Sequence, residues 1–247
     1  MPILELQKIS INYSAVRALH EVDLTLDAGE VVGLMGDNGA GKSLLVKTIG
    51  GLLQPDHGRV LLDGRVVEMT TPHVAQTHGI AIVHQDLALC DNLTAAENIF
   101  LGREPVRRLG PLSLVDHAAL RDRAAKMLTE LESSTPPDAL VKDLSGGQRQ
   151  ATAIARVLAC EARVILFDEP TAAIGLKQVE EVLALIKRLK AQGKAVLFIS
   201  HRIHDVFSVC DRIAVLWHGE KIADKPVRAT TPEEIMGFIN GIGRDAA

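Results

Sequence analysis

The chain contains 247 residues, of which 47% are apolar and 23% are charged, and its formal net charge at pH 7 is −4. This composition is typical of a soluble globular protein, with enough length for one large domain or for a core with a subdomain. The acidic balance and the lack of a basic tract argue against nucleic acid as the main partner. No apolar run approaches the length of a membrane span, and the first residues do not predict a signal peptide. The three cysteines follow no metal-ligand spacing and predict free thiols in a reducing compartment.

The first third of the chain predicts antiparallel strands. Apolar and polar residues alternate over 4–13, with a slip in the middle that predicts a bulge, and they alternate again over 22–26. Apolar residues at 60–62 and 66–67 flank Asp63-Gly64-Arg65, which is typical of a hairpin turn.

A glycine-rich motif lies between these strands. Residues 36–43 read GDNGAGKS and fit the phosphate-binding pattern G-x-x-x-x-G-K-[ST]. The glycines allow backbone N–H groups to turn inward as an anion-binding nest, and the helix that follows adds its positive end. A predicted buried strand over 30–35 and a predicted helix over 43–53 argue against a chance glycine loop. Lys42 is expected to meet the β- and γ-phosphates, and Ser43 to offer its hydroxyl to Mg²⁺.

The middle of the chain, over 87–159, predicts a largely helical insertion between two halves of an α/β core. Thr94, with a glutamate three residues later, predicts a capped helix that runs through 101. Proline and glycine within 103–113 predict a loop, in which Arg107-Arg108 is solvated rather than part of a binding patch. An amphipathic pattern over 116–131 predicts a further helix.

The last third returns to buried strands. Apolar runs over 163–167 and 195–199 are typical of strands buried on both faces of a parallel sheet, with a predicted helix over 176–192 between them. The first run ends in Asp168-Glu169 and the second in Ser200-His201. The first carboxylate is placed to hold a Mg²⁺ shell, and the second to orient or deprotonate an attacking water. A solvated acidic pair at a strand end is the alternative, and the glycine-rich motif upstream favours the functional interpretation.

A second motif, LSGGQ, lies at 144–148. Ser145 predicts a helix N-cap, and Gly146 and Gly147 expose the backbone at the helix start as a second anion-binding end. An ordinary capped helix is the alternative. Beside the first motif, this stretch resembles the signature of the ATP-binding cassette (ABC) ATPases, and the resemblance extends over residues 3–240.

The resemblance implies an α/β fold with a P-loop NTPase (RecA-like) core, an antiparallel β subdomain and an inserted α-helical subdomain. It places the core and β subdomain at 1–86 and 160–247, and the helical subdomain with the signature motif at 87–159. The implied cofactors are ATP and Mg²⁺. Tyr13 resembles the aromatic residue that stacks on adenine, with Val16 beside it.

Further site residues follow from the same resemblance. Gln85 resembles the glutamine that touches Mg²⁺ and the membrane partner. Asp168 and Glu169 resemble the Walker B aspartate and the catalytic glutamate. His201 resembles the switch histidine near the γ-phosphate. The implied catalytic residues are Glu169, His201 and Lys42. The implied Mg²⁺ ligands are Ser43, Gln85 and Asp168. The implied nucleotide-binding residues are Tyr13, Val16, Gly36, Asp37, Asn38, Gly39, Ala40, Gly41, Lys42, Ser43, Leu44, Gln85, Ser145, Gly146, Gly147 and Gln148.

The family resemblance also implies that two copies pair head to tail, so that residues 145–148 of one copy complete the ATP site of the other. Two positions depart from the family's pattern. Leu44 replaces a hydroxyl residue that helps to hold the α-phosphate and offers only its backbone N–H, which predicts weaker nucleotide affinity. Gly175 replaces an aspartate that bridges the two subunits, which places the usual coupling between the paired sites in doubt, although some carbohydrate importers of the family are similar here.

Residues 85–93, 98–104 and 171–173 resemble the monosaccharide importers of the ribose, xylose and fructose type. The implied function is the ATP-hydrolysing subunit of a sugar importer, peripheral on the cytoplasmic face of a bacterial inner membrane. Its implied partners are integral-membrane permease subunits and, indirectly, a solute-binding protein, with no nucleic acid. The alternatives are an ATPase for another solute importer or exporter, and a soluble ABC ATPase that acts outside transport.

Overall fold

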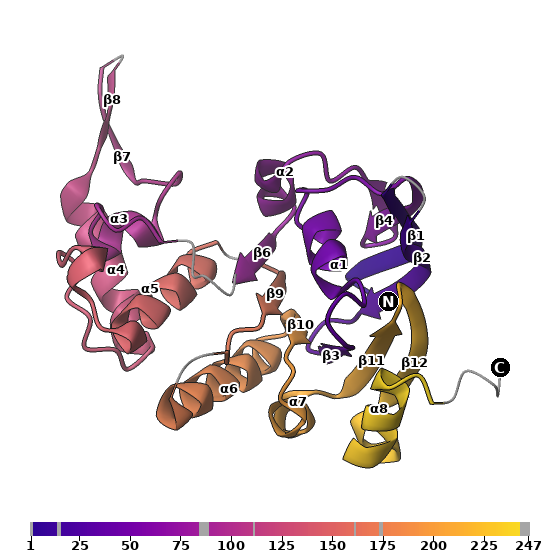
Figure 1. Ribbon diagram of the computed structural model, residues 1–247. Helices are drawn as coiled ribbons and strands as arrows, with labels where there is room; N and C mark the ends of the chain where they lie inside the picture. Colours follow the sequence, from indigo (N-terminus) through magenta and orange to yellow (C-terminus); the bar gives the residue numbers. More distant parts are fainter. Residues whose placement is uncertain are drawn as a thin grey trace. The chain divides into compact units, whose positions relative to one another are not determined.

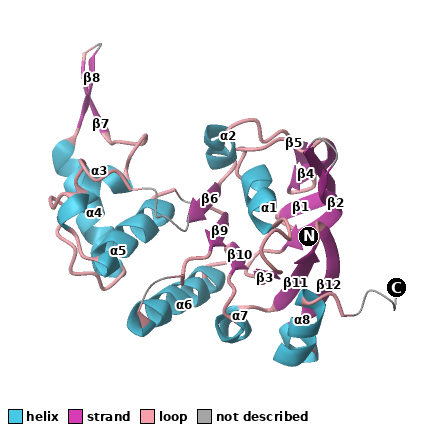
Figure 2. Ribbon diagram, in the orientation of Figure 1, coloured by secondary structure: helices cyan, strands magenta, loops and turns pink. Residues whose placement is uncertain are grey.

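The computed structural model describes residues 2–13, 16–83, 89–110, 112–160, 162–172 and 175–242 (Figure 1). The chain divides into two compact units, Met1–Ile82 with Arg163–Ala247, and Val83–Ala162. The first unit combines helices with two sheets, whereas the second is mainly helical and carries one hairpin (Figure 2).

A six-stranded sheet, with strand order β12-β11-β3-β10-β9-β6, forms the centre of the first unit. Its strands are β3 (Val31–Met35), β6 (Ile80–Val83), β9 (Val164–Asp168), β10 (Ala195–Ile199), β11 (Arg212–Trp217) and β12 (Glu220–Pro226). The neighbours β11, β3, β10 and β9 run parallel. Every residue of β3 and β10 is buried, which confirms the prediction of strands covered on both faces.

The helices of this unit follow the apolar periodicity of the sequence. They are α1 (Lys42–Ile49), α2 (Pro72–Thr77), α6 (Leu176–Ala191), α7 (Ile203–Val209) and α8 (Pro232–Ile239), with a short 3₁₀ turn at η2 (Val227–Ala229). In α6, Val179, Val182, Ile186 and Leu189 recur at spacings of three and four and are buried, so one stripe of the helix faces the core. Helix α1 is shorter than the predicted 43–53, because Gly51 adopts a φ of 73° that a helix does not continue through.

A four-stranded antiparallel sheet, with order β2-β1-β4-β5, packs in the same unit. Its strands are β1 (Leu4–Tyr13), β2 (Val16–Leu26), β4 (His57–Leu62) and β5 (Arg65–Val67). The register of β1 against β2 shifts between Leu6 and Ile9, which confirms the predicted bulge. Leu62 pairs with Arg65 across the predicted hairpin turn.

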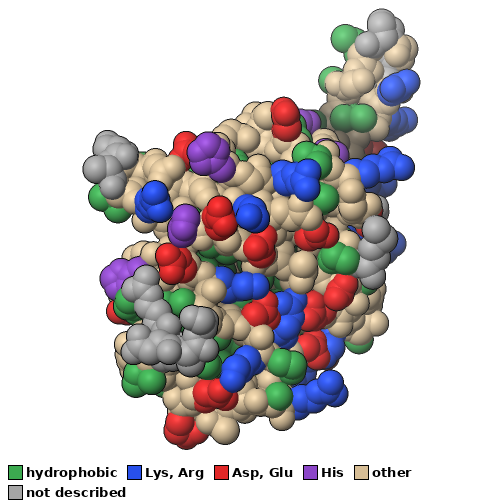
Figure 3. Space-filling view, turned by 90° about the vertical axis from the view of Figure 1, so that its right-hand side faces the viewer, with side chains coloured by type: hydrophobic (Ala, Val, Ile, Leu, Met, Phe, Trp, Pro, Cys, Tyr) green, Lys and Arg blue, Asp and Glu red, His purple; other side chains and the backbone are tan. Residues whose placement is uncertain are grey.

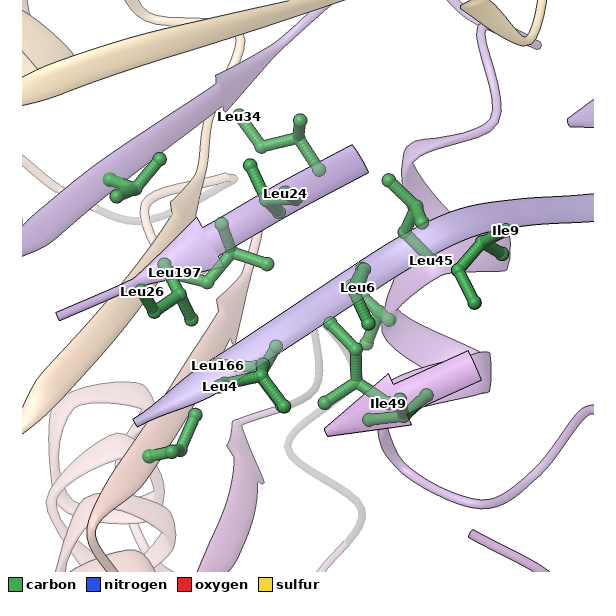
Figure 4. Close-up of a cluster of buried hydrophobic side chains, with 14 of the residues drawn as sticks. Leu4, Leu6, Ile9, Leu24, Leu26, Leu34, Leu45, Ile49, Leu166 and Leu197 are labelled. Carbon is green, nitrogen blue, oxygen red and sulfur yellow. The ribbon is translucent and has the colours of Figure 1, made fainter. Parts of the chain in front are cut away.

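Buried leucine and isoleucine side chains of both sheets and of α1 form one core (Figure 4). Leu6 and Leu24 come from the antiparallel sheet, Leu166 and Leu197 from the central parallel strands, and Leu45 from α1. Each of these five side chains is at most 2% exposed. The core therefore holds α1, and the loop that precedes it, against both sheets.

In the described part of the second unit, three helices pack around a smaller core. They are α3 (Ala95–Ile99), α4 (His117–Glu130) and α5 (Gly146–Leu158), with a 3₁₀ turn at η1 (Val141–Asp143). Thr94 Oγ1 accepts from Glu97 N at 3.2 Å and Glu97 Oε2 accepts from Thr94 N at 2.8 Å, so the predicted capping box is confirmed, although the helix ends at Ile99 rather than 101. Leu120 and Leu128 from α4 bury against Ile99.

The prediction of a loop over 103–113 is wrong. Strand β7 (Val106–Leu109) pairs antiparallel with β8 (Leu112–Val115). Pro105 precedes β7, where its missing N–H interrupts no ladder bond. Pro105 therefore marks the start of the strand, and Arg107 and Arg108 lie on a strand rather than in a loop.

Among the described residues, no helix combines the length and the apolar character that crossing a membrane requires.

Candidate functional site

Three neighbouring strands of the parallel sheet end side by side. Ile199, the last residue of β10, pairs with Leu34 of β3 on one side and with Asp168 of β9 on the other. The segments that follow these strands therefore leave the same edge of the sheet. They carry the glycine-rich loop 36–43, the acidic residue Glu169, and His201. This edge, at the carboxyl ends of parallel strands, is where open α/β sheets bind ligands.

The glycine-rich loop is shaped by positive backbone angles. Gly36, Gly39 and Gly41 have φ values of 151°, 82° and 105°. A Cβ on Gly36 would lie 2.3 Å from the carbonyl oxygen of Leu216, and one on Gly41 would lie 2.4 Å from Leu19 Cδ2. Glycine is thus required at 36 and 41 for space as well as for conformation. Gly41 is the N-cap of α1, so the loop leads directly into the positive end of that helix.

Lys42 lies inside the loop rather than in solvent. Its Nζ donates to the carbonyl oxygens of Gly36 at 2.8 Å and Asp37 at 2.9 Å, and the residue is 7% exposed. Burial lowers the pKa of Lys42, while the charges of Glu169, Asp37 and Asp168 act in the opposite direction. The ammonium group is therefore held beside the acidic residues at the centre of the loop.

Glu169 and His201 form a pair across two strand ends. His201 Nε2 lies 2.7 Å from Glu169 Oε1, and the backbone N–H of Glu169 donates to Ile199 O at 3.1 Å. Glu169 has a φ of 54°, an uncommon angle for a residue with a side chain. Its side chain is 13% exposed, whereas that of His201 is 50% exposed. Burial raises the pKa of Glu169, His201 and Lys42 lower it, and Asp168 raises it.

Ser43 and Asp168 supply oxygen atoms at the same edge. Ser43 is exposed in the first turn of α1, and Asp168 is half-buried at the end of β9. No cluster of three His, Cys, Asp or Glu side chains that could hold a metal occurs in the described part of the chain. This donor set suits Mg²⁺, which takes one or two carboxylates and completes its shell with phosphate oxygens and water.

Leu44 turns toward the protein interior. Its side chain is partly buried against the core of the first unit, and its backbone N–H donates to Gly41 O at 3.1 Å. The backbone N–H of Leu44, predicted to meet a phosphate, thus has a hydrogen-bond partner inside the protein.

Tyr13 and Val16 lie at the paired ends of β1 and β2 and are 53% and 67% exposed. The start of β2 lies beside the glycine-rich loop, since the Cβ position of Gly41 is 3.2 Å from the carbonyl oxygen of Ala18. An exposed apolar pair therefore occurs on the strand that borders the loop. Gln85, a further predicted nucleotide and metal ligand, lies outside the described residues.

Two supports of the site were not predicted. Gly219 N donates to Ala40 O at 3.1 Å, and its own carbonyl accepts from His20 N at 2.9 Å, which joins the loop to β2. Ser200 Oγ accepts from Arg202 N at 3.1 Å and lies 3.4 Å from Thr171 Oγ1, so two buried hydroxyls join the segments that follow β9 and β10. The sequence feature that could have indicated this role for Ser200 is its position directly after the apolar run 195–199.

The LSGGQ motif belongs to the second unit. Ser145 Oγ accepts from Gln148 N at 3.4 Å, and Gln148 Oε1 accepts from Ser145 N at 3.0 Å, so the predicted N-cap of α5 is confirmed as a capping box. Ser145 and Gly146 are exposed, Gly147 is half-buried, and a Cβ on Gly146 would meet no atom within 4 Å. Within this unit, Arg149 Nη2 contacts Asp91 Oδ1 at 2.7 Å and ties the first turn of α5 to the segment that precedes α3.

A separate hollow of about 940 Å³ lies on the antiparallel sheet. Acidic and basic side chains line it, among them Glu5, Lys8 and Arg59, and charges of both signs are interspersed on this side of the molecule (Figure 3). Its lining includes none of Lys42, Glu169 and His201. The chemistry-bearing residues therefore lie elsewhere, at the edge of the parallel sheet.

Comparison with known proteins gives consistent matches. The family described as ABC transporter matches residues 19–172. The ribose import ATP-binding protein RbsA 1 of Agrobacterium fabrum is 41% identical over 244 residues, which cover 99% of this chain and 47% of that protein. The chain spans about half the length of the curated relatives it matches.

Solved structures match over nearly the whole chain. A nucleotide-free ATP-binding cassette from an ABC transporter superposes with a TM-score of 0.80 at 26% identity, covering 98% of this chain and 96% of the other. A dimeric ATP-binding cassette in a post-hydrolysis state, bound to ADP and Pi, superposes with a TM-score of 0.77 at 30% identity, covering 92% of this chain and 100% of the other.

Proposed function

The chain belongs to the ABC transporter family, and from this premise we propose that it binds ATP with Mg²⁺ and hydrolyses it. One observation carries the proposal. The buried ammonium group of Lys42 lies in the glycine-rich loop, and the Glu169–His201 pair lies at the end of the neighbouring strands. Phosphate binding and water activation are thereby available at one sheet edge.

Lys42 and the loop bind the phosphates in this proposal. The two carbonyl oxygens that now accept from Lys42 Nζ are neutral, so a triphosphate competes for this cation through full negative charges. The N-terminus of α1 adds its dipole to the same site. Tyr13 and Val16 cover the adenine, and the backbone of residues 36–44 surrounds the phosphates. The hydrogen bond from Leu44 N to Gly41 O persists unless the nucleotide displaces it.

Glu169 orients and deprotonates the attacking water. Burial raises the pKa of Glu169, which makes its carboxylate a stronger base. His201 and Lys42 together stabilise the charge that develops on the transferred phosphoryl group. Mg²⁺, when bound, neutralises phosphate charge. Ser43, Asp168 and Gln85 are the residues that would hold it.

Two copies of the chain form the complete site. Ser145, Gly146, Gly147 and Gln148 of a second copy meet the γ-phosphate in a head-to-tail dimer, so that ATP links the copies and hydrolysis releases them. The exposed, capped start of α5 supports this role, as does the similarity to a dimeric cassette that is bound to ADP and Pi. In this arrangement residues 1–86 and 160–247 form the core with its β subdomain, and residues 87–159 form the helical subdomain.

The transported solute is proposed to be a monosaccharide. The relatives at about 40% identity are ribose import ATP-binding proteins, which favours sugar import over the other ABC functions. The chain is then a peripheral subunit on the cytoplasmic face of a bacterial inner membrane, docked on permease subunits that receive sugar from a solute-binding protein. Another solute, or a role outside transport, is the alternative.

The experiment that tests the ATPase is substitution of the central cation. Lys42→Ala is expected to abolish ATP binding by isothermal titration calorimetry and to abolish phosphate release, while Lys47→Ala, in the last turn of the same helix, preserves both. Binding of ATP to Lys42→Ala at wild-type affinity would refute the assignment. The sugar is identified by reconstituting the chain with its permease and measuring which sugar-loaded binding protein stimulates hydrolysis.

A further inference from the structure

The hairpin formed by β7 and β8 exposes apolar side chains on both of its faces. Val106 and Val115 are 57% and 41% exposed, and Leu112 and Leu114 are 64% and 51% exposed. Val106 pairs with Val115, and Arg107 pairs with Leu114, so the two valines share one face and the two leucines share the other. A two-stranded hairpin is at best marginally stable alone in water, so this much exposed apolar surface indicates a binding partner.

The hairpin is also basic. Arg107 and Arg108 are adjacent on β7, so one guanidinium projects from each face, and both residues are exposed. No aspartate or glutamate occurs between Val106 and Val115, although the chain as a whole carries a net charge of −4. The local charge is therefore opposite in sign to that of the chain, which favours a partner with a negative surface.

The base of the hairpin is fixed to the helices of its own unit. Asp116 N donates to Pro105 O at 2.7 Å and closes the base of the two strands. Asp116 Oδ1 accepts from Ala119 N at 3.0 Å and caps α4, whose Leu120 and Leu128 are buried in the core of the unit. The two strands extend away from α3, α4 and α5 (Figure 1), and Figure 3 shows hydrophobic and basic side chains on them.

We propose that this hairpin contacts the surface of a lipid bilayer that contains anionic phospholipids. A flat protein surface covers one face of a hairpin, whereas the interfacial region of a bilayer surrounds both, which matches apolar side chains on the two faces. Arg107 and Arg108 pair with the phosphate groups of the lipids while the valines and leucines enter the boundary between head groups and acyl chains. The contact is a membrane-facing surface of the second unit and is separate from the ATP site.

Sedimentation of the full chain with lipid vesicles tests the proposal. Vesicles of phosphatidylcholine mixed equally with phosphatidylglycerol are expected to bind the chain, and vesicles of phosphatidylcholine alone to bind it much more weakly. Arg107→Gln with Arg108→Gln should lower the partition coefficient by about twenty-five-fold, roughly fivefold for each arginine. Added salt should weaken binding of the wild type more than that of this variant.

Apolar variants test the other half of the contact. Leu112→Ser with Leu114→Ser should lower partitioning by about tenfold or more. The matched controls are Leu176→Ser, at a leucine that is 75% exposed on α6, and Arg123→Gln, at an exposed arginine of α4, and both should bind vesicles as the wild type does. All variants should bind ATP normally, because the hairpin is outside the nucleotide site.

Two results would overturn the proposal. The first would be that the wild type binds anionic vesicles no more strongly than phosphatidylcholine vesicles, or that both hairpin variants bind anionic vesicles as strongly as the wild type does. The second is binding that requires permease in the vesicles, which would assign the hairpin to a protein partner. ATP binding measured on the same preparations reports separately on the proposed ATPase function.

Discussion

His201 Nε2 and Glu169 Oε1 lie 2.7 Å apart, although the two residues are separated by a whole helix and strand of the sequence. The pairing arises because β9 and β10 are parallel neighbours whose ends coincide. Glu169 reaches this position with a backbone φ of 54°, so the carboxylate is placed at a local conformational cost that the surrounding structure must offset.

Removing the charge of Glu169 should separate ATP binding from hydrolysis. Glu169→Gln preserves shape but removes the base, so phosphate release is expected to fall by about 10²–10⁴-fold while ATP binding persists. ATP should then trap a dimer that gel filtration detects. Glu180→Gln, at an exposed glutamate on α6, is the control and should hydrolyse ATP normally. Hydrolysis by Glu169→Gln at the wild-type rate would contradict the role given to this residue.

The pH dependence of stability should reveal the burial of Glu169. Its pKa is raised in the folded protein, so the folded state binds this proton more tightly than the unfolded chain does. The stability linked to Glu169 is therefore fully present below the ordinary pKa of glutamate and is lost as pH rises through the raised value. In thermal unfolding experiments, the stability of Glu169→Gln relative to that of the wild type should increase as pH rises over this window. An equal difference at every pH would be inconsistent with the raised pKa.

The stability linked to Glu97 should change with pH in the opposite direction. Hydrogen bonds from the backbone and side chain of Thr94 lower the pKa of Glu97, so its contribution is present above the ordinary pKa of glutamate and is lost as pH falls through the lowered value. Glu97→Gln should therefore be less stable than the wild type near neutral pH, and the difference should shrink on acidification. Thermal unfolding of the wild type and of Glu97→Gln, measured from neutral to acidic pH, gives this difference in stability.

The glycines of the phosphate loop should differ in what they tolerate. Gly41→Ala faces both a φ of 105° and a contact 2.4 Å from Leu19 Cδ2, so we expect a loss of about 3 kcal/mol or more in the free energy of unfolding. Gly39→Ala has a φ of 82° but meets no atom within 4 Å, so its expected cost is about 1–2 kcal/mol. Urea titrations compare the two, and equal losses would exclude the steric contribution at Gly41.

Leu44→Thr should strengthen nucleotide binding. A hydroxyl at this position can donate to the α-phosphate, and one hydrogen bond corresponds to about a two- to tenfold change in affinity. Leu44→Val is the matched control, because valine has the shape of threonine without the hydroxyl and shares its loss of packing against the core. Calorimetric Kd values that are the same for the two variants would show that position 44 does not limit affinity.

Local patterns predicted much of the site because they act over short distances. The spacing of Gly36, Gly41 and Lys42, the capping box at Ser145, and the apolar runs before Asp168 and Ser200 each depend on residues within a few positions of one another. Over 103–113 the local pattern predicted a loop and not a hairpin, because proline and glycine are typical of loops and Val-Arg-Arg-Leu of β7 lacks the alternation of apolar and polar residues that indicates a strand.

The sequence alone determined which residue types are present for chemistry: a phosphate loop with its lysine, a carboxylate pair, a histidine after a buried strand, and a capped glycine helix start. Tertiary structure alone decided that β10 lies between β3 and β9, which brings Glu169 and His201 into contact and Lys42 into the same field of charges. It also decided the burial that raises the pKa of Glu169 and the exposure of the β7–β8 hairpin. The reason is physical: strand order and burial depend on contacts between segments distant in the chain, whereas caps, turns and loop angles depend on neighbouring residues.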